Sequence, residues 1–224
     1  MMGVWCLIAA GVMFVLYPAL RPWEDESTAD GAIAAMSSPA WVASHAFAMI
    51  GFILVALGLL ALASAVRGTP AARTARAAAV TGLIGTGLTL PYYGAEDFGL
   101  HAIASHAAAG ARMDVLSIVD DVRYQPVAMT MFGVGLITLA VSGVLAAIAV
   151  ARSGRISRSA GWLFAIGYVL FLPQFFGPPV VRIAHGALLG IGLIWLAIAL
   201  GSAHGQARVN RAGDREAATV AGRS

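Results

Sequence analysis

Residues 41–66 read WVASHAFAMIGFILVALGLLALASAV, a long apolar run without a charged side chain. About 20 apolar residues are enough for an α-helix to cross the roughly 30 Å hydrocarbon core of a bilayer. Lipid offers no partners to backbone N–H and C=O groups, so a segment in it has to satisfy them internally, as a helix does. The stretch therefore predicts a membrane-spanning helix.

The rest of the chain continues this pattern. Its 224 residues are 59% hydrophobic and 11% charged, with a mean hydropathy of +0.82, which is too apolar for a soluble domain. A transmembrane barrel would alternate polar and apolar residues in segments of about ten, and this chain does not. We expect an all-α polytopic transmembrane helical bundle, built as a single integral membrane domain over residues 1–204. The six expected spans are about 3–20, 41–66, 77–94, 126–150, 159–177 and 180–203.

The charges between these spans differ from one side to the other. Loops 67–76 and 152–158 carry three arginines each and no acid, whereas the opposite connections carry nine acids and four arginines. The positive-inside rule then predicts that both termini lie in the cytoplasm. We expect the protein to lie in the inner (plasma) membrane. The same distribution argues against a nucleic-acid partner despite a pI near 9.5, and it leaves the lipid bilayer as the predicted partner.

The C-terminal residues 205–224 are polar and rich in small residues, without apolar periodicity. They predict a disordered cytoplasmic tail.

Two parts of the chain resemble each other at a separation of about 82 residues. Residues 49–52 (MIGF) match 131–134 (MFGV), and Leu90-Pro91 matches Leu172-Pro173. The pattern predicts a parallel internal repeat that relates spans 2–3 to spans 4–5. Chance matching in a chain rich in Ala, Leu and Gly is the alternative.

The stretch 91–106, PYYGAEDFGLHAIASH, gathers ionisable groups where the third span ends. If it is helical, Tyr93, Asp97 and His101 share one face at i, i+4 spacing. His45 and His185 lie about one turn inside their own spans, at a similar depth.

Imidazole and carboxylate groups suit Zn²⁺, Fe²⁺ or Cu²⁺. We therefore predict an outward-facing metal site made of His45, Asp97, His101 and His185. Glu96 is the candidate general base for a metal-bound water, in a protein that acts on a lipid or a small molecule.

Several alternatives remain open for these residues. Tyr93, His106 and Arg182 are further polar residues of the predicted site. His45 and His185 are also the pair that a haem would need, and interfacial histidines often have only structural roles. Arg182 either reaches lipid phosphates or pairs with Asp97 or Glu96. Two other function classes fit the sequence: a proton-coupled small-molecule carrier, and a non-catalytic scaffold or accessory subunit.

Glycines recur at helical spacing in two of the spans. Gly82, Gly85 and Gly87 lie in the third span, and Gly186 and Gly190 lie in the sixth. Small residues at such spacing allow helices to approach closely. They predict close packing within the chain, and a glycine-rich face is also a candidate seam for a homo-oligomer.

Overall fold

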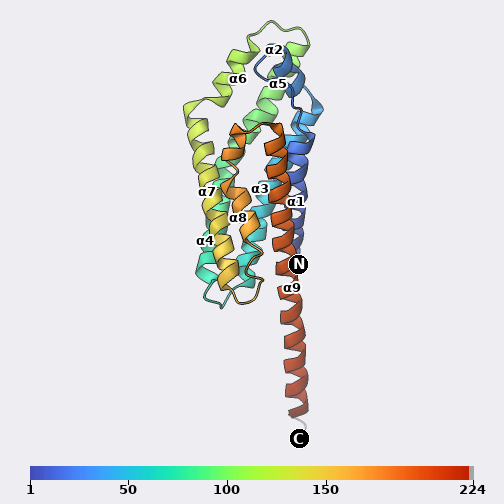
Figure 1. The fold of residues 1–224 in the computed structure, drawn as a ribbon, viewed down its shortest axis with the longest axis vertical. Coiled ribbons are helices and arrows are strands. Elements are labelled where there is room, and N and C mark those ends of the chain that lie inside the picture. The colour runs from blue at the N-terminus through green and yellow to red at the C-terminus, as the bar shows by residue number, and fades with distance from the viewer. Residues whose placement is uncertain (222–224) are drawn as a thin grey trace.

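The computed structural model describes the backbone of residues 1–221 and the side chains of residues 1–203, 205 and 206. The described chain is all-helical and forms an elongated bundle with a group of short helices at one end (Figure 1). The long helices are α1 (Met2–Leu20), α3 (Pro39–Ala65), α4 (Ala72–Gly94), α7 (Pro126–Arg152) and α9 (Pro179–Ala221). The short elements are α2 (Ala29–Met36), the π-helical turn η1 (Ala95–Gly99), α5 (Leu100–Ala108), α6 (Val115–Arg123), α8 (Trp162–Val169) and the 3-10 turn η2 (Pro173–Phe176).

Four of the described helices are long and apolar enough to cross a bilayer. They are α1, α3, α7 and the Pro179–Ala203 part of α9. The class of helical membrane protein predicted from the sequence is supported, whereas the number of six spans is not confirmed. Helix α4 has sufficient length, but Arg73, Arg76 and its threonines and glycines lower its hydropathy, and it lies within the bundle against α3 and α7.

The fifth predicted span, 159–177, is interrupted. Helix α8 ends at Val169, turns follow, and η2 begins at Pro173. Pro173 has no N–H to donate to the carbonyl four residues before it, so a regular helix cannot continue its hydrogen bonding through this point. The segment therefore has eight residues of α-helix instead of a full span.

The expected internal repeat is not confirmed. Its first unit pairs α3 with the continuous helix α4, whereas its second pairs α7 with the interrupted α8. The matched dipeptides Leu90-Pro91 and Leu172-Pro173 lie in different structures, because Pro91 is inside α4 and Pro173 starts η2.

Two helix starts show why α3 and α7 begin where they do. Pro39 and Pro126 each occupy the first turn, where a missing N–H costs nothing. Ser38 and Gln125 are the residues before these prolines, and their side chains accept hydrogen bonds from backbone N–H groups of the first turn. The predicted place of Pro126 at a helix start is confirmed.

The glycines of α9 are used inside the chain. A Cβ added to Gly186 would lie 2.6 Å from the carbonyl oxygen of Phe14, and one added to Gly190 would lie 2.7 Å from that of Gly11. This face of α9 therefore packs directly on the backbone of α1. The expected close packing is confirmed there, and the homo-oligomer stays a prediction.

The glycines of α4 differ among themselves. Added Cβ atoms on Gly82 and Gly85 would meet side chains of α3 and α7 at 2.8–2.9 Å, whereas Gly87 has open space around it. Close packing is thus confirmed for the first two and not for the third.

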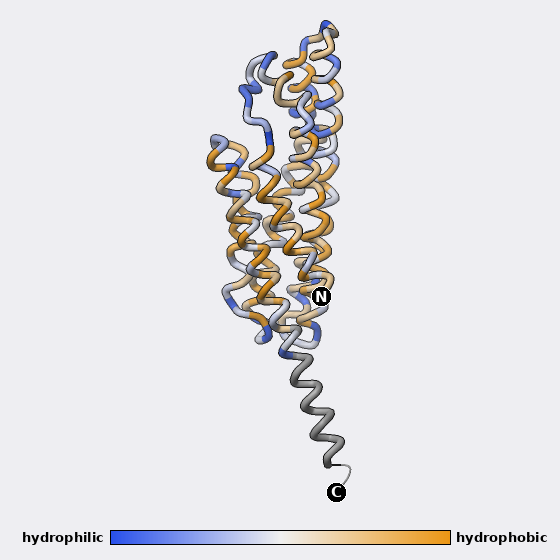
Figure 2. Tube along the Cα trace, turned by 90° about the vertical axis from the view of Figure 1, so that its right-hand side faces the viewer, coloured by the Kyte–Doolittle hydropathy of each residue, from blue (hydrophilic) through white to orange (hydrophobic). Residues whose placement is uncertain are grey.

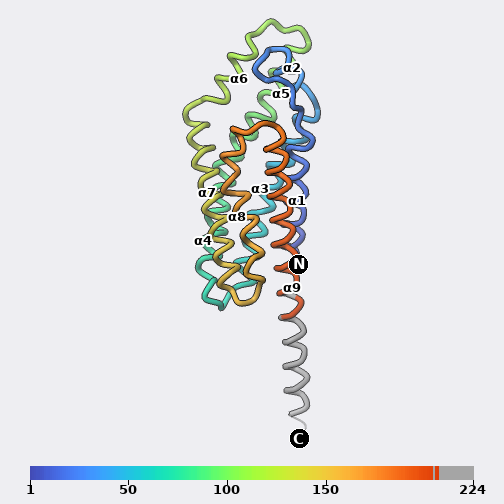
Figure 3. The backbone as a smooth tube through the Cα atoms, in the orientation of Figure 1, coloured from blue at the N-terminus to red at the C-terminus, as the bar shows by residue number. Residues whose placement is uncertain are grey.

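The short helices α2, α5 and α6, together with η1, form what we call the cap. Its small apolar core includes Met36, Trp41, Leu100 and Val119 and is separate from the larger core of the bundle. The acidic connections lie in this cap, and the arginine-rich loops 67–76 and 152–158 lie at the opposite end (Figure 3). Apolar residues dominate between the two ends (Figure 2).

The last part of α9 covers the segment for which the sequence predicts a disordered tail. Helix α9 ends at Ala221, and disorder from residue 205 stays a prediction. The segment contains no proline, and its Ala, Arg, Glu and Gln residues have high helix propensity. Residues 222–224 of the predicted tail lie outside the described residues.

Candidate functional site: a charged and aromatic cavity under the cap

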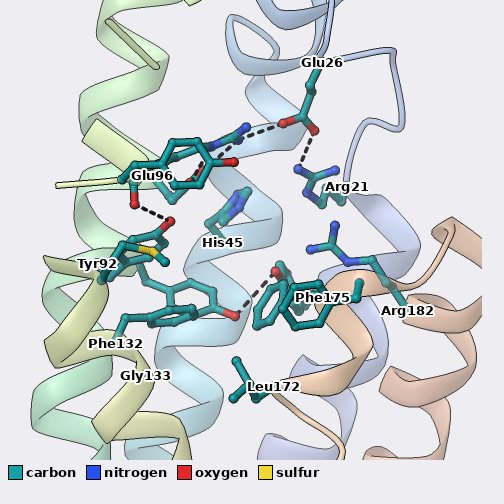
Figure 4. A pocket seen from close by; sticks show the side chains of 16 residues that line it. Arg21, Glu26, His45, Tyr92, Glu96, Phe132, Gly133, Leu172, Phe175 and Arg182 are labelled. Atoms are coloured by element: carbon teal, nitrogen blue, oxygen red, sulfur yellow. Dashed lines mark hydrogen bonds and ion pairs between the residues drawn. The ribbon is translucent and has the colours of Figure 1, made fainter. Parts of the chain in front are cut away.

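A cavity of about 440 Å³ lies where the bundle meets the cap. Ligand pockets in proteins typically have this size. Its walls come from the end of α1, the following loop, α3, α4, η1, α6, α7, η2 and the start of α9. Charged groups occupy one part of it and aromatic rings most of the remainder (Figure 4).

An alternating chain of four charges crosses one wall of the cavity. Arg21 Nη2 donates to Glu26 Oε1 at 2.5 Å, and Arg123 Nη2 donates to Glu26 Oε2 at 2.7 Å. Arg123 also holds Glu96 with two bonds, Nε to Oε1 at 2.7 Å and Nη2 to Oε2 at 3.1 Å. This paired geometry is the strongest that a guanidinium makes with a carboxylate. The chain ties the loop after α1 to η1 and α6.

The environment of this chain favours the ionised forms. Burial alone would raise the pKa of Glu26, but the Arg21 and Arg123 guanidiniums outweigh it and hold that pKa below its ordinary value. Burial opposes the charge of Arg123 as well, but Glu96 and Glu26 keep its pKa above the usual value. Glu26 and Arg123 therefore favour their charged forms, and the chain pairs two guanidiniums with two carboxylates.

A second chain alternates arginine with aromatic rings. The Arg21 guanidinium lies 4.6 Å from the ring centre of Trp23 and 4.7 Å from that of Trp41. Arg182 lies 5.0 Å from the same Trp23 ring and 5.1 Å from the ring of Phe175. Cations attract the negative face of an aromatic ring, so these contacts position both arginines. Trp23 thereby joins the two basic groups.

Arg182 differs from the other two arginines that line the cavity. Among the described side chains it has no carboxylate partner and no hydrogen bond, and the predicted pair with Asp97 or Glu96 is not formed. Figure 4 shows its guanidinium directed into the cavity on the side of Arg21. The lining thus holds three arginines and two glutamates, a net charge of one positive unit.

Aromatic side chains form the opposite wall. Tyr92 stacks on Phe132 with ring centres 4.2 Å apart, and its hydroxyl donates to the carbonyl of Arg123 at 3.3 Å. Tyr93, predicted as a site residue, lines the cavity too, and its hydroxyl meets that of Tyr17 at 3.5 Å. The wall gives the cavity an apolar surface with hydroxyl groups at its edge.

His45 faces the cavity, as a site residue should, but its ring is already held. Nδ1 lies 2.8 Å from the carbonyl oxygen of Trp41, and the ring packs on Trp41 at 4.4 Å. A carbonyl oxygen can only accept, so Nδ1 carries the proton. In the neutral imidazole Nε2 is then an acceptor.

The other two predicted metal-ligand histidines close helix ends. His101 Nδ1 lies 2.8 Å from the carbonyl oxygen of Met36, the last residue of α2. His185 Nε2 lies 2.8 Å from the carbonyl oxygen of Gly167 near the end of α8. Final-turn carbonyls lack partners in their own helix, so both imidazoles satisfy groups that would otherwise be orphaned.

The structure does not support the predicted metal site. The described residues contain no group of three or more His, Cys, Asp or Glu side chains that could hold a metal ion. Of the four proposed ligands, only His45 lines the cavity, while His185 lines a separate void of about 10 Å³. Similar depth along a helix does not by itself place side chains on facing surfaces, which is why the structure gives the prediction no support. The two histidines of the haem alternative likewise lie on different cavities.

The two acidic residues of the predicted site have different surroundings. Both oxygens of Glu96 accept bonds from Arg123, so its carboxylate is engaged, and its role as a general base stays a prediction. Asp97 is fully buried, and neither of its oxygens has a described hydrogen-bond partner. Burial raises the pKa of Asp97 to about 6, against a smaller lowering effect of His101. His106 lies exposed on α5, away from the cavity lining.

The sequence analysis missed Arg21, Glu26 and Arg123 as site residues. A signal for two of them was present, because only four arginines occur on the acidic side of the bundle. Three of these four line the cavity, namely Arg21, Arg123 and Arg182. Arginines that oppose the charge bias of their own side are candidates for a specific partner.

No protein-family model, curated protein or solved structure matches this chain. The function therefore has to be argued from the geometry of the cavity.

Proposed function

We propose that this protein is a multi-pass membrane protein that binds a ligand with an anionic group, such as a phosphate, in the cavity under the cap. The observation that carries the proposal is Arg182, a half-buried guanidinium at the cavity that has no acidic partner among the described side chains. The other four charges of the lining neutralise one another, so Arg182 is left to attract an anion.

The chemistry of the site favours this ligand class. A guanidinium presents a planar fork of donors that matches the oxygens of a phosphate or carboxylate. The stacking of Arg182 on Trp23 and Phe175 orients this fork before a ligand arrives, which reduces the entropy lost on binding. The aromatic wall around Tyr92 and Phe132 favours an apolar group on the same ligand.

The position of the cavity favours a binding role over that of a carrier. Coupled carriers place their sites near the midplane of the membrane, between broken helices. Here the four paired charges lie outside the helices that could span a bilayer, and Arg182 lies in the first turn of the spanning part of α9, at the cap end. The positive-inside rule directs this end outward, so we infer a receptor-like or accessory binding function at the outer face.

Binding of butyl phosphate to the purified protein tests the proposal. This probe is water-soluble and carries the phosphate group shared by lipid head groups and free phosphate; inorganic phosphate and butanoate form the comparison arms. Tryptophan fluorescence reports binding, because Trp23 contacts Arg182. Arg182→Gln is expected to weaken the affinity at least tenfold, since a hydrogen bond to a charged group is worth about 1.5–3 kcal/mol.

Two further variants make the result specific. Arg182→Lys keeps the charge and should retain part of the affinity. Arg73→Gln removes an exposed arginine at the other end of the bundle and should bind as the unaltered protein does. Equal affinities of the unaltered protein and Arg182→Gln, or no binding of any of the three anions, would overturn the proposal.

A further inference from the structure

A second hollow adjoins the cavity and shares Leu172 with it. It is an apolar groove of about 470 Å³ between α7 and the end of α8. Nine residues line it, all of them apolar, and several are exposed, such as Ile137 at 58% and Val169 at 45%. Because α7 is long and apolar enough to span a bilayer, this groove lies at membrane depth.

One face of α7 lines both hollows. Phe132 and Gly133 line the cavity, and Leu136 and Ile137, one turn further along, line the groove, which continues to Val144. Residues at i, i+3 and i+4 spacing share a helix face, so the cavity wall passes directly into the groove wall. From Phe132 to Val144 this face extends about 18 Å at the rise of an α-helix.

The opposite side of the passage is also shared. Leu172, in the turn between α8 and η2, lines the cavity and the groove alike. At the junction, Gly133 leaves room: a Cβ added there would meet nothing within 4 Å. The interruption of α8 and the missing side chain at residue 133 thus coincide where the two hollows meet.

We infer that the cavity and the groove form one site for a lipid with an anionic head, whose head group lies at Arg182 and whose hydrocarbon chain lies along α7. This inference rests on the proposed function, and it names the class of ligand.

Two observations favour a lipid chain as the occupant of the groove. The lining offers apolar surface without hydrogen-bonding side chains, which suits a hydrocarbon chain. The length of about 18 Å is similar to half of the roughly 30 Å hydrocarbon core, which is the depth that one lipid chain covers. A small soluble anion would occupy the cavity and leave the groove unused.

A photoreactive probe tests the inference in nanodiscs of zwitterionic phosphatidylcholine. Dodecyl phosphate with a diazirine near the end of its chain reports by cross-linking where that end lies. In the unaltered protein the label should map to 137–144 and 169–173. Dodecanol with the same diazirine serves as the neutral control and should label this region several-fold less.

Ala140→Phe should fill the groove without reaching the cavity, because Ala140 lines only the groove. We expect at least fivefold less labelling of the groove in this variant, with the affinity for butyl phosphate retained. Gly87→Phe is the matched control, because Gly87 also lies within a helix, has open space around it and lines neither hollow. The probe enters the bilayer to the same extent with both variants, so a difference in labelling between them reports binding in the groove.

The outcomes separate the two proposals. If butyl phosphate binds through Arg182 but Ala140→Phe leaves groove labelling unchanged, the lipid inference is wrong and the anion site stands. If dodecanol labels the groove as strongly as dodecyl phosphate does, the inference is wrong as well. If butyl phosphate does not bind and Arg182→Gln does not alter labelling, the anion site and the inference that rests on it both fail.

Discussion

Glu96 and Asp97 are consecutive in the sequence and buried in the same π-helical turn, but their side chains lie in different surroundings. Glu96 faces the cavity, where Arg123 holds both of its oxygens. Asp97 is fully buried, and its carboxylate has no described hydrogen-bond partner. The cavity region pairs its acid with a counter-charge, whereas burial around Asp97 raises the pKa of its carboxyl to about 6 and so penalises the ionised form.

The difference shows that burial alone does not determine the state of a carboxylate. Removing a charge from water costs several kcal/mol, which either an ion pair or protonation can offset. A π-helical turn often marks a functional site, and here it directs two neighbouring acids to different surroundings. The three predictions below test this contrast, from the largest expected effect to the smallest.

Replacement of Arg123 should have the largest effect. Arg123→Met leaves the carboxylates of Glu96 and Glu26 without their shared partner, so we expect a loss of about 3 kcal/mol in the free energy of unfolding. Unfolding of the detergent-solubilised protein by SDS, followed by circular dichroism, measures it. Arg112→Met removes an exposed arginine and is the control. Similar stabilities of the two variants would show that the cavity acids do not depend on their counter-charge.

The removal of the charge of Asp97 should act in the opposite direction. The pKa of Asp97 is about 6 in the folded protein, against 3.8 for a free side chain, so the folded state binds the proton more tightly. Stability should therefore decrease as the pH rises from about 4 to 6 and remain low above that range. Asp97→Asn should remove this dependence and stabilise the protein at pH 7.5 by up to about 3 kcal/mol.

The same unfolding assay, carried out between pH 4 and 8, measures this effect. Asp120→Asn is the control, because Asp120 is exposed on α6. A pH profile of Asp97→Asn that matches the profile of the unaltered protein would contradict the assignment of a raised pKa to Asp97.

The smallest effect concerns the bond that links the two regions. Trp41 Nε1 donates to the carbonyl oxygen of Glu96 at 2.8 Å, so the indole fixes the backbone next to both acids. Trp41→Phe keeps an aromatic ring and removes this donor, which should cost about 1–2 kcal/mol. Trp162→Phe is the control, because Trp162 is 45% exposed. It should cost less than about 0.5 kcal/mol, as surface substitutions usually do. Equal losses would show that the bond to Glu96 contributes nothing.

The fold was predictable from the sequence to the extent that hydropathy determines it. The apolar runs of α1, α3, α7 and α9 identify these helices, because lipid leaves a long apolar segment no other regular structure. The interruption of α8 was not predicted. The carbonyl of Gly167, which the interruption leaves without a helical partner, is bonded by His185 of α9. A contact between two segments of this kind cannot be read from the local sequence around Pro173.

The candidate site was predictable only in part. The stretch 91–106 led to Tyr93 and Glu96, and spacing correctly brought His45 and Arg182 to the same end of the bundle. The partners of these residues depend on contacts between distant segments, since Glu26 and Arg123 are 97 positions apart. Helical spacing reports which residues share a face of one helix. It does not report which face of another helix they meet, and for this reason the predicted histidine cluster does not form.

The order of the five charges along the chain has a consequence for biosynthesis. Arg21, Glu26, Glu96 and Arg123 emerge from the ribosome in the first 123 residues, and together they are electrically neutral. Arg182 arrives last, with the helix that also covers α1. A nascent chain halted before α9 would therefore carry a complete set of ion pairs but no spare cation. Under the proposed function, the cation that recognises the anion is therefore the last of the five charged groups to be synthesised.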